Sequence, residues 1–318
     1  MANTNHKLYL GMYSFKIKKN GTKDTDTVSI NDFLSEAYPD VDNKFQEGFA
    51  QEIIDLFDSK TFKNKQDTHG GTLEEKSIAT ENRYFDIVID GGLTGIQQFL
   101  LDEDGNKEVI SKDKVVGLKF YARFWMPAGN KTGYIFIQKY GGLSLKPLFD
   151  ELVLSTLRAH GFNIADRRRK MTPITTKKRL KEFLKKSSLR DVTVISKQSS
   201  HDTGMADAQT VTVRLSRFNQ LKKGKAIDRD AVEDALKNHG FTLGDRYYDM
   251  TATYESRQDG KKVEEKTTRL DATEDTVNII PNILIPEHCI DQDRYPRFEQ
   301  IKQFVNEEIE QIKTETKM

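Results

Sequence analysis

Between residues 83 and 140 the chain contains a succession of short apolar runs rich in β-forming residues, and this pattern constrains its fold most strongly. The runs are RYFDIVIDGG, GIQQFLLDEDGNK, KVVGLKFYARFWM and GYIFIQKY. Gly-Gly, Asp-Gly and Gly-Asn pairs punctuate them, and such pairs favour the tight turns of β-hairpins. Because tight turns join antiparallel neighbours, the sequence predicts an antiparallel meander with turns at sites such as Gly91-Gly92.

Helical spacing of apolar residues appears at 45–57, at about 144–160 and at about 297–313, while residues 7–17 alternate as a strand does. The segment 63–83 is polar and carries glycines, which is typical of a surface loop. We therefore expect an α+β protein with mainly antiparallel sheets and flanking helices.

One stretch of sequence recurs along the chain. LRAHGFNIADRRRKMT (157–172) aligns without gaps on LKNHGFTLGDRYYDMT (236–251). In both, His-Gly-Phe predicts a helix end, with the glycine in the left-handed conformation. Strand-like runs precede and follow each helix, so we expect a degenerate tandem duplication of a strand-strand-helix-strand unit. Chance recurrence of a common helix ending is the alternative.

These patterns divide the 318 residues into four regions. They are an N-terminal α+β region (1–112), a first strand-strand-helix-strand unit with a basic helix (113–188), a second unit (189–275) and a C-terminal extension (276–318). The extension ends in a helix whose apolar stripe packs on the body, binds a partner protein or forms a homo-oligomer.

The composition bounds the cellular setting. A single cysteine, Cys289, excludes an internal disulfide framework and suits a reducing compartment. The N-terminus lacks the pattern of a signal peptide, and no apolar run approaches the length of a membrane span. We therefore expect a cytoplasmic protein without membrane insertion.

The segment 165–191, ADRRRKMTPITTKKRLKEFLKKSSLRD, is strongly basic although the whole chain has a net charge of only +1. We expect a helix at about 175–188, with Leu180, Phe183 and Leu184 on one face and Lys177, Lys181 and Lys185 on another. Like charges at this spacing repel, so an anionic partner opposite them is expected, and phosphate backbones are the commonest. The predicted contacts to DNA or RNA are Arg167, Arg168, Arg169, Lys170, Lys177, Lys178, Arg179, Lys181, Lys185 and Lys186.

One alternative is that this basic segment is a solvated face, balanced by acidic residues elsewhere in the fold. Another is that it meets a membrane surface or an acidic protein partner. The near-neutral total charge argues against broad, unspecific binding to polyanions.

Catalytic signatures are weak throughout the sequence, which favours binding without chemistry and predicts no cofactor. The enzymatic alternative is a metal-dependent nuclease, which needs an acid on one strand and an acid-x-Lys on the next. Asp249, Glu264 and Lys266 fit that pattern, and a divalent metal enters only under this alternative.

The run GYIFIQKYGGLSLKPLFDELV, with the basic helix and the strand after it, resembles uncharacterised bacterial proteins of phage-defence and mobile-element neighbourhoods. The resemblance covers the middle third of the chain and implies an anti-phage role together with a partner protein. It implies no mechanism and assigns no site residue.

Overall fold

A computed structural model describes residues 7–57, 61–101, 104–112, 114–199, 208–216, 229–238, 248–258, 261–269, 279–292 and 295–317. The chain forms two compact units. The large unit comprises Met1–Ile174 with Ile283–Glu310, and the small unit comprises Thr175–Asn282 with Gln311–Met318.

The large unit is built on a ten-stranded sheet in which every pairing is antiparallel. Its main path runs β10-β1-β9-β8-β5-β4-β3. These strands are β1 (Leu8–Lys19), β3 (Phe62–Lys63), β4 (His69–Ala79), β5 (Tyr84–Leu93), β8 (Val116–Trp125), β9 (Thr132–Tyr140) and β10 (Phe162–Ile164). Three further strands pair with β1: β2 (Thr27–Val28), β11 (Thr172–Pro173) and β16 (Ile283–Leu284). A separate hairpin joins β6 (Gln98–Leu101) to β7 (Lys107–Ile110). The structure thus confirms the α+β class and the antiparallel pairing.

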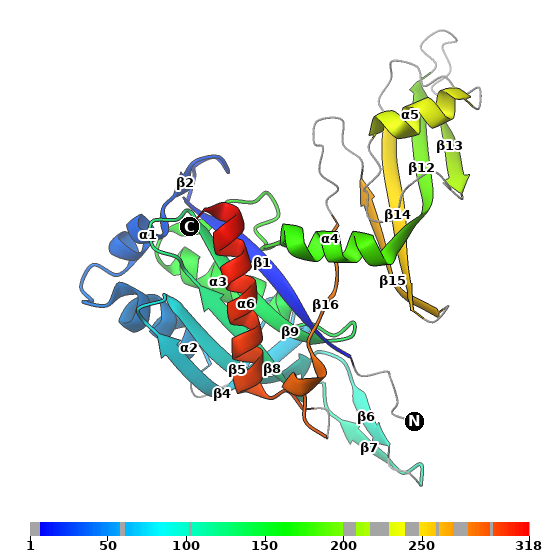
Figure 1. Cartoon of the computed structure of the whole chain (residues 1–318). Coiled ribbons are helices and arrows are strands. Elements are labelled where there is room, and N and C mark those ends of the chain that lie inside the picture. Colours follow the sequence, from blue (N-terminus) through cyan, green and yellow to red (C-terminus); the bar gives the residue numbers. More distant parts are fainter. Residues whose placement is uncertain are drawn as a thin grey trace. The chain divides into compact units, whose positions relative to one another are not determined.

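Both faces of this sheet are covered, and the alternation along β8 shows it. Phe120, Ala122 and Phe124 enter the core formed with the helices of one face. Those helices are α1 (Ile30–Ala37), the π-helix η1 (Lys44–Ala50), α2 (Gln51–Asp55) and α3 (Lys146–Ala159). Tyr121 and Arg123 point to the opposite face, where Arg123 donates to Asn306 of α6 (Phe298–Thr316). Figure 1 shows α6 lying across the strands on that face.

The expected amphipathic C-terminal helix is present, and its stripe is buried within its own chain. Ile301, Val305 and Ile309 are at most 3 % exposed. The stripe is therefore covered within the chain, and binding of a partner protein or a second copy through this helix stays a prediction. The interpretation that this helix packs on the body is the right one.

Two further expectations for the large unit are wrong. The segment predicted as a loop, 63–83, contains the second residue of β3 and the whole eleven-residue strand β4. β4 pairs with β5 over its whole length, with a bulge between Leu73 and Glu75. The expected boundary at residue 112 separates no compact units, because β5 and β8, on either side of it, pair from Tyr84↔Trp125 to Leu93↔Val116.

The small unit is a four-stranded antiparallel sheet of order β13-β12-β14-β15 with helices on one face. Its elements are α4 (Lys177–Lys186), β12 (Ser187–Ser199), β13 (Ala208–Ser216), α5 (Arg229–Asn238), β14 (Tyr248–Gln258) and β15 (Lys261–Arg269). Figure 1 shows α5 lying across the sheet. Val192, Val194, Met250 and Ala252 form one face, and Phe183 and Leu184 of α4 pack into the same core. The turn expected at Asp259-Gly260 lies outside the described residues.

The predicted helix ending is confirmed at the first of its two sites. α3 ends at Ala159, and Gly161 follows with φ of +79°. The second site, His239-Gly240-Phe241, lies outside the described residues. The order strand, strand, helix, strand occurs as β8, β9, α3, β10 in the large unit and as β12, β13, α5, β14 in the small unit. The last strand pairs differently in the two. β10 pairs with β1, which is not part of the repeat, whereas β14 pairs with β12, the first strand of its own repeat.

Candidate nucleic-acid interface

The basic helix α4 forms where the sequence predicts it. Thr176 precedes it with an extended backbone, and its side chain accepts a hydrogen bond from the Arg179 backbone N–H at 3.3 Å. This hydrogen bond satisfies one of the amide groups that a helix N-terminus leaves without a partner. Phe183 and Leu184 are buried and Leu180 is half-buried, so the predicted apolar face holds the helix on the sheet.

The lysines lie on another side of α4. At 100° per residue, Lys177, Lys178, Lys181 and Lys185 fall within about a third of the helix circumference. All four are exposed, as is Lys186. Within the described residues none of the five forms an ion pair.

The cations on the sheet of the small unit behave differently. Arg214 pairs with Asp191 at 2.6 Å, and Arg190 of β12 pairs with Glu265 of β15. Arg269 pairs with Asp249. On α4 itself, Arg179 pairs with Glu182 at 3.0 Å, so of the predicted contacts on this helix only Arg179 is neutralised locally. The lysine face of α4 therefore concentrates positive charge that has no ion pair among the described residues.

One acidic side chain does reach α4, but it does not neutralise the lysines. Glu315, in the last turn of α6, accepts from the backbone N–H of Lys178 at 3.4 Å. A carboxylate at a helix N-terminus stabilises the helix through the partial positive charge of the amide groups there. Glu315 thus contacts the backbone at the start of α4 and forms no ion pair with the lysine side chains among the described residues.

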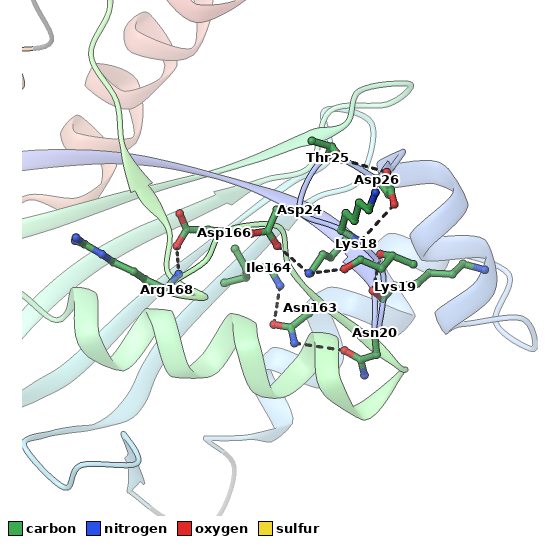
Figure 2. Close-up of polar contacts among 12 residues, drawn as sticks. Lys18, Lys19, Asn20, Asp24, Thr25, Asp26, Asn163, Ile164, Asp166 and Arg168 are labelled. Atoms are coloured by element: carbon green, nitrogen blue, oxygen red, sulfur yellow. Dashed lines mark hydrogen bonds and ion pairs between the residues drawn. The ribbon is translucent and has the colours of Figure 1, made fainter. Parts of the chain in front are cut away.

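The remaining predicted contacts, Arg167 to Lys170, belong to the large unit, so the structure assigns the basic segment to two units. These four side chains are exposed. The Asp166 carboxylate accepts from the backbone N–H of Arg168 at 2.8 Å, and Figure 2 shows the guanidinium of Arg168 directed away from Asp166. A turn therefore presents these cations, with Arg169 in the left-handed region at φ of +54°.

The nuclease candidates do not converge. Glu264 pairs in register with Ser256, seven residues along β14 from Asp249, which corresponds to about 23 Å at the rise of a strand. Lys266 lies 3.5 Å from Glu264 and also donates to Asn282, and the Asn282 backbone N–H donates to Glu264 at 2.7 Å. Asp249, Glu264 and Lys266 thus serve the packing of the sheet and of residue 282. The expectation of a shared metal site is corrected.

Two cations that sequence reasoning missed lie beside Arg168, Arg169 and Lys170. Lys65 and Arg158 line the same hollow in the large unit. The sequence around Lys65 and around Arg158 does not indicate a site, because neither residue belongs to a cluster of charges along the chain. Only the fold brings them together.

Comparison with known proteins adds no assignment. No protein-family model, no curated protein and no solved structure matches the chain. Among the described residues, no group of three or more His, Cys, Asp or Glu side chains is arranged to hold a metal ion. No helix in the described part of the chain is long and apolar enough to cross a membrane.

Proposed function

We propose that the protein binds nucleic acid through the exposed lysine face of α4, formed by Lys177, Lys178, Lys181 and Lys185, without chemistry of its own. The observation that carries the proposal is the contrast within the small unit. Arginines on its sheet are paired with carboxylates, whereas the lysines of α4 are exposed and have no ion pair among the described residues.

The energetics favour an anionic partner for this face. Like charges four residues apart destabilise a helix by about 0.2–0.5 kcal/mol per pair, and Lys177, Lys181 and Lys185 form two such pairs. A chain of regularly spaced phosphates relieves this repulsion, and it gains further by releasing condensed counterions. Such contacts fix the position of the protein on the nucleic acid but read little sequence, because lysines meet phosphates and not base edges.

The resemblance to bacterial proteins of phage-defence neighbourhoods suggests the setting. In that setting, binding through α4 would recruit the protein to foreign DNA or RNA, and a partner protein would act on the target. This role requires of the protein's own residues only that they bind nucleic acid.

The test is binding of labelled double-stranded DNA, single-stranded DNA and RNA over a salt series, with and without Mg²⁺. The triple variant Lys177→Glu/Lys181→Glu/Lys185→Glu should abolish measurable binding. Where weak binding persists, the logarithm of the binding constant should depend less steeply on salt, by about 0.9 for each phosphate of duplex DNA that is no longer neutralised.

A matched control separates this face from total charge. Lys76, Lys112 and Lys114 are exposed lysines of the large unit, and their reversal to Glu changes the net charge equally. This control should bind nearly as well as the wild type. Unchanged affinity of the α4 variant, or equal loss in the control, would refute the proposal. Metal-dependent cutting by the wild type would refute the absence of chemistry.

A further inference from the structure

The large unit contains a hollow of about 490 Å³ around which five cationic side chains gather. Lys65 comes from the loop before β4, Arg158 from the last turn of α3, and Arg168, Arg169 and Lys170 from the turn after β10. The volume lies within the range of small-ligand sites, about 300–1,000 Å³.

The charges around this hollow are not balanced by ion pairs. All five cations are exposed, and none of them has an ion pair within the described part of the chain. Two carboxylates, Asp150 and Glu151, also line it. Asp150 is already engaged, because it accepts from the Lys146 ammonium at 2.6 Å and from the Met171 backbone N–H at 3.0 Å. The hollow therefore keeps a net positive charge.

The segments that carry the cations are held in place from behind. The buried Asn64 accepts from the backbone N–H groups of Thr68 and His69 at 2.9 Å each, which fixes the loop bearing Lys65. Asp166 fixes the turn bearing Arg168 in the same way, through its side chain and through its backbone carbonyl to Arg169 at 2.8 Å. The scaffold is thus organised before any ligand arrives, which lowers the entropic cost of binding.

We infer that this hollow binds a terminal phosphate group through Lys65, Arg158, Arg168, Arg169 and Lys170. A terminal phosphate carries close to two negative charges at neutral pH, whereas a phosphate inside a nucleic-acid chain carries one. Arginine guanidinium groups match phosphate oxygens with two parallel hydrogen bonds, and three of the five cations are arginines. A hollow admits the end of a molecule, while the convex lysine face of α4 suits a continuous backbone.

The same chemistry has two sources: a free nucleotide or the 5′-phosphate end of a nucleic-acid chain. The inference does not require that α4 bind nucleic acid, since the two sets of residues belong to different units.

The experiment measures the affinity of the full-length protein for pyrophosphate, for ATP, and for an oligonucleotide with either a 5′-phosphate or a 5′-hydroxyl. The test variant is Lys65→Gln/Arg168→Gln, which removes one cation from each of two segments and leaves the bonds of Asn64 and Asp166 intact. Each substitution removes a charge-assisted hydrogen bond and should weaken binding by about tenfold, so that the pair weakens it by about a hundredfold.

The outcomes separate the sources. Loss of ATP and pyrophosphate binding in the variant supports the site and assigns a free nucleotide. Loss of a preference for the 5′-phosphorylated oligonucleotide supports it and assigns a chain end. Equal binding of wild type and variant to every probe overturns the inference.

Two controls keep this result apart from the function proposed for α4. Lys76→Gln removes an exposed lysine of β4 away from the hollow and should bind each probe as the wild type does. The α4 triple variant should lose backbone binding but keep its affinity for ATP and pyrophosphate, so failure of one proposal leaves the other measurable.

Discussion

Arg123 in the large unit and Lys181 in the small unit are both cations on regular elements, and their surroundings are opposite. Arg123 is 1 % exposed, lies 2.6 Å from the Asp86 carboxylate through Nε, and stacks on Tyr84 at 4.0 Å. Lys181 is exposed and has no ion pair among the described residues. A buried cation without its partner is costly, whereas an exposed one costs little and stays available to a ligand.

The difference follows from how each sheet is covered. In the large unit helices lie on both faces, so a charge on β8 is enclosed and must be compensated within the fold. In the small unit α4 covers one face of the sheet and turns its own outer side to solvent. Charge buried on the large sheet therefore serves packing, as at Arg123, whereas charge on the outer side of α4 stays exposed.

The largest expected effect is on the buried pair. Asp86→Ala should lower the free energy of unfolding of the large unit by about 3–5 kcal/mol, because it leaves the Arg123 charge buried and unpaired. Trp125, the single tryptophan, is buried in this unit, so its fluorescence during denaturant unfolding reports it selectively.

The matched change is Asp249→Ala, which removes the partner of the exposed Arg269 and should cost less than about 1 kcal/mol. A second probe is Cys289, which is fully buried. Because the Cys289 side chain is inaccessible, it should react with a thiol reagent only when the unit opens, and burial also raises the pKa of the thiol. Equal losses in the Asp86 and Asp249 variants would refute the distinction between the two regions.

A smaller loss is expected in the core of the small unit. Leu184→Ala leaves a cavity between α4 and the sheet and should cost about 2–5 kcal/mol. Circular dichroism should show this unit unfolding earlier, while the Trp125 transition stays where it was. A Trp125 transition displaced as far as the circular dichroism signal would mean that the two units unfold as one.

The helix cap ranks third. Thr176→Ala removes the side-chain acceptor of the Arg179 N–H and should destabilise α4 by about 1 kcal/mol. Thermal unfolding of the small unit measures this loss of stability. The control is Thr176→Ser, which keeps the hydroxyl group. If the serine variant loses as much stability as the alanine variant, the cap is not the cause.

The smallest effect has the opposite sign. Lys181→Gln removes like-charge repulsion with Lys177 and Lys185 and should stabilise α4 by about 0.5–1 kcal/mol at low salt. The gain should shrink as salt screens the charges, whereas nucleic-acid binding should weaken at every salt concentration tested. A destabilised Lys181→Gln would show that this lysine has a stabilising contact in the fold.

Local sequence patterns predicted much of the fold, but they failed where a segment's structure depends on the strand next to it in the sheet. α4 and the apolar stripe of α6 were visible because helical spacing is a local property. β4 was missed because it is largely polar and only two of its residues are buried, so pairing with β5 and not burial makes it a strand. Gly91 and Gly92, predicted as a turn, lie inside β5, where a Cβ on Gly92 would collide with the Val116 carbonyl of β8. The glycines permit a close approach of two strands.

The candidate sites divide in the same way. The sequence indicated the basic segment and the lysine face, because clustering of charge along the chain is visible without a fold. It could not place Lys65 and Arg158 beside Arg168, and it wrongly grouped Asp249 with Glu264, since strand register sets which side chains meet.

By itself the sequence determined the α+β class, the antiparallel pairing, the amphipathic helices and the one stretch of dense positive charge. These depend on contacts between residues close along the chain. The tertiary structure alone decided that this stretch is shared by two units, which cations keep a carboxylate partner, and which face of α6 is covered. Those outcomes depend on contacts between residues that are distant in sequence. Strand register and the helices that cover each sheet determine which of these residues meet.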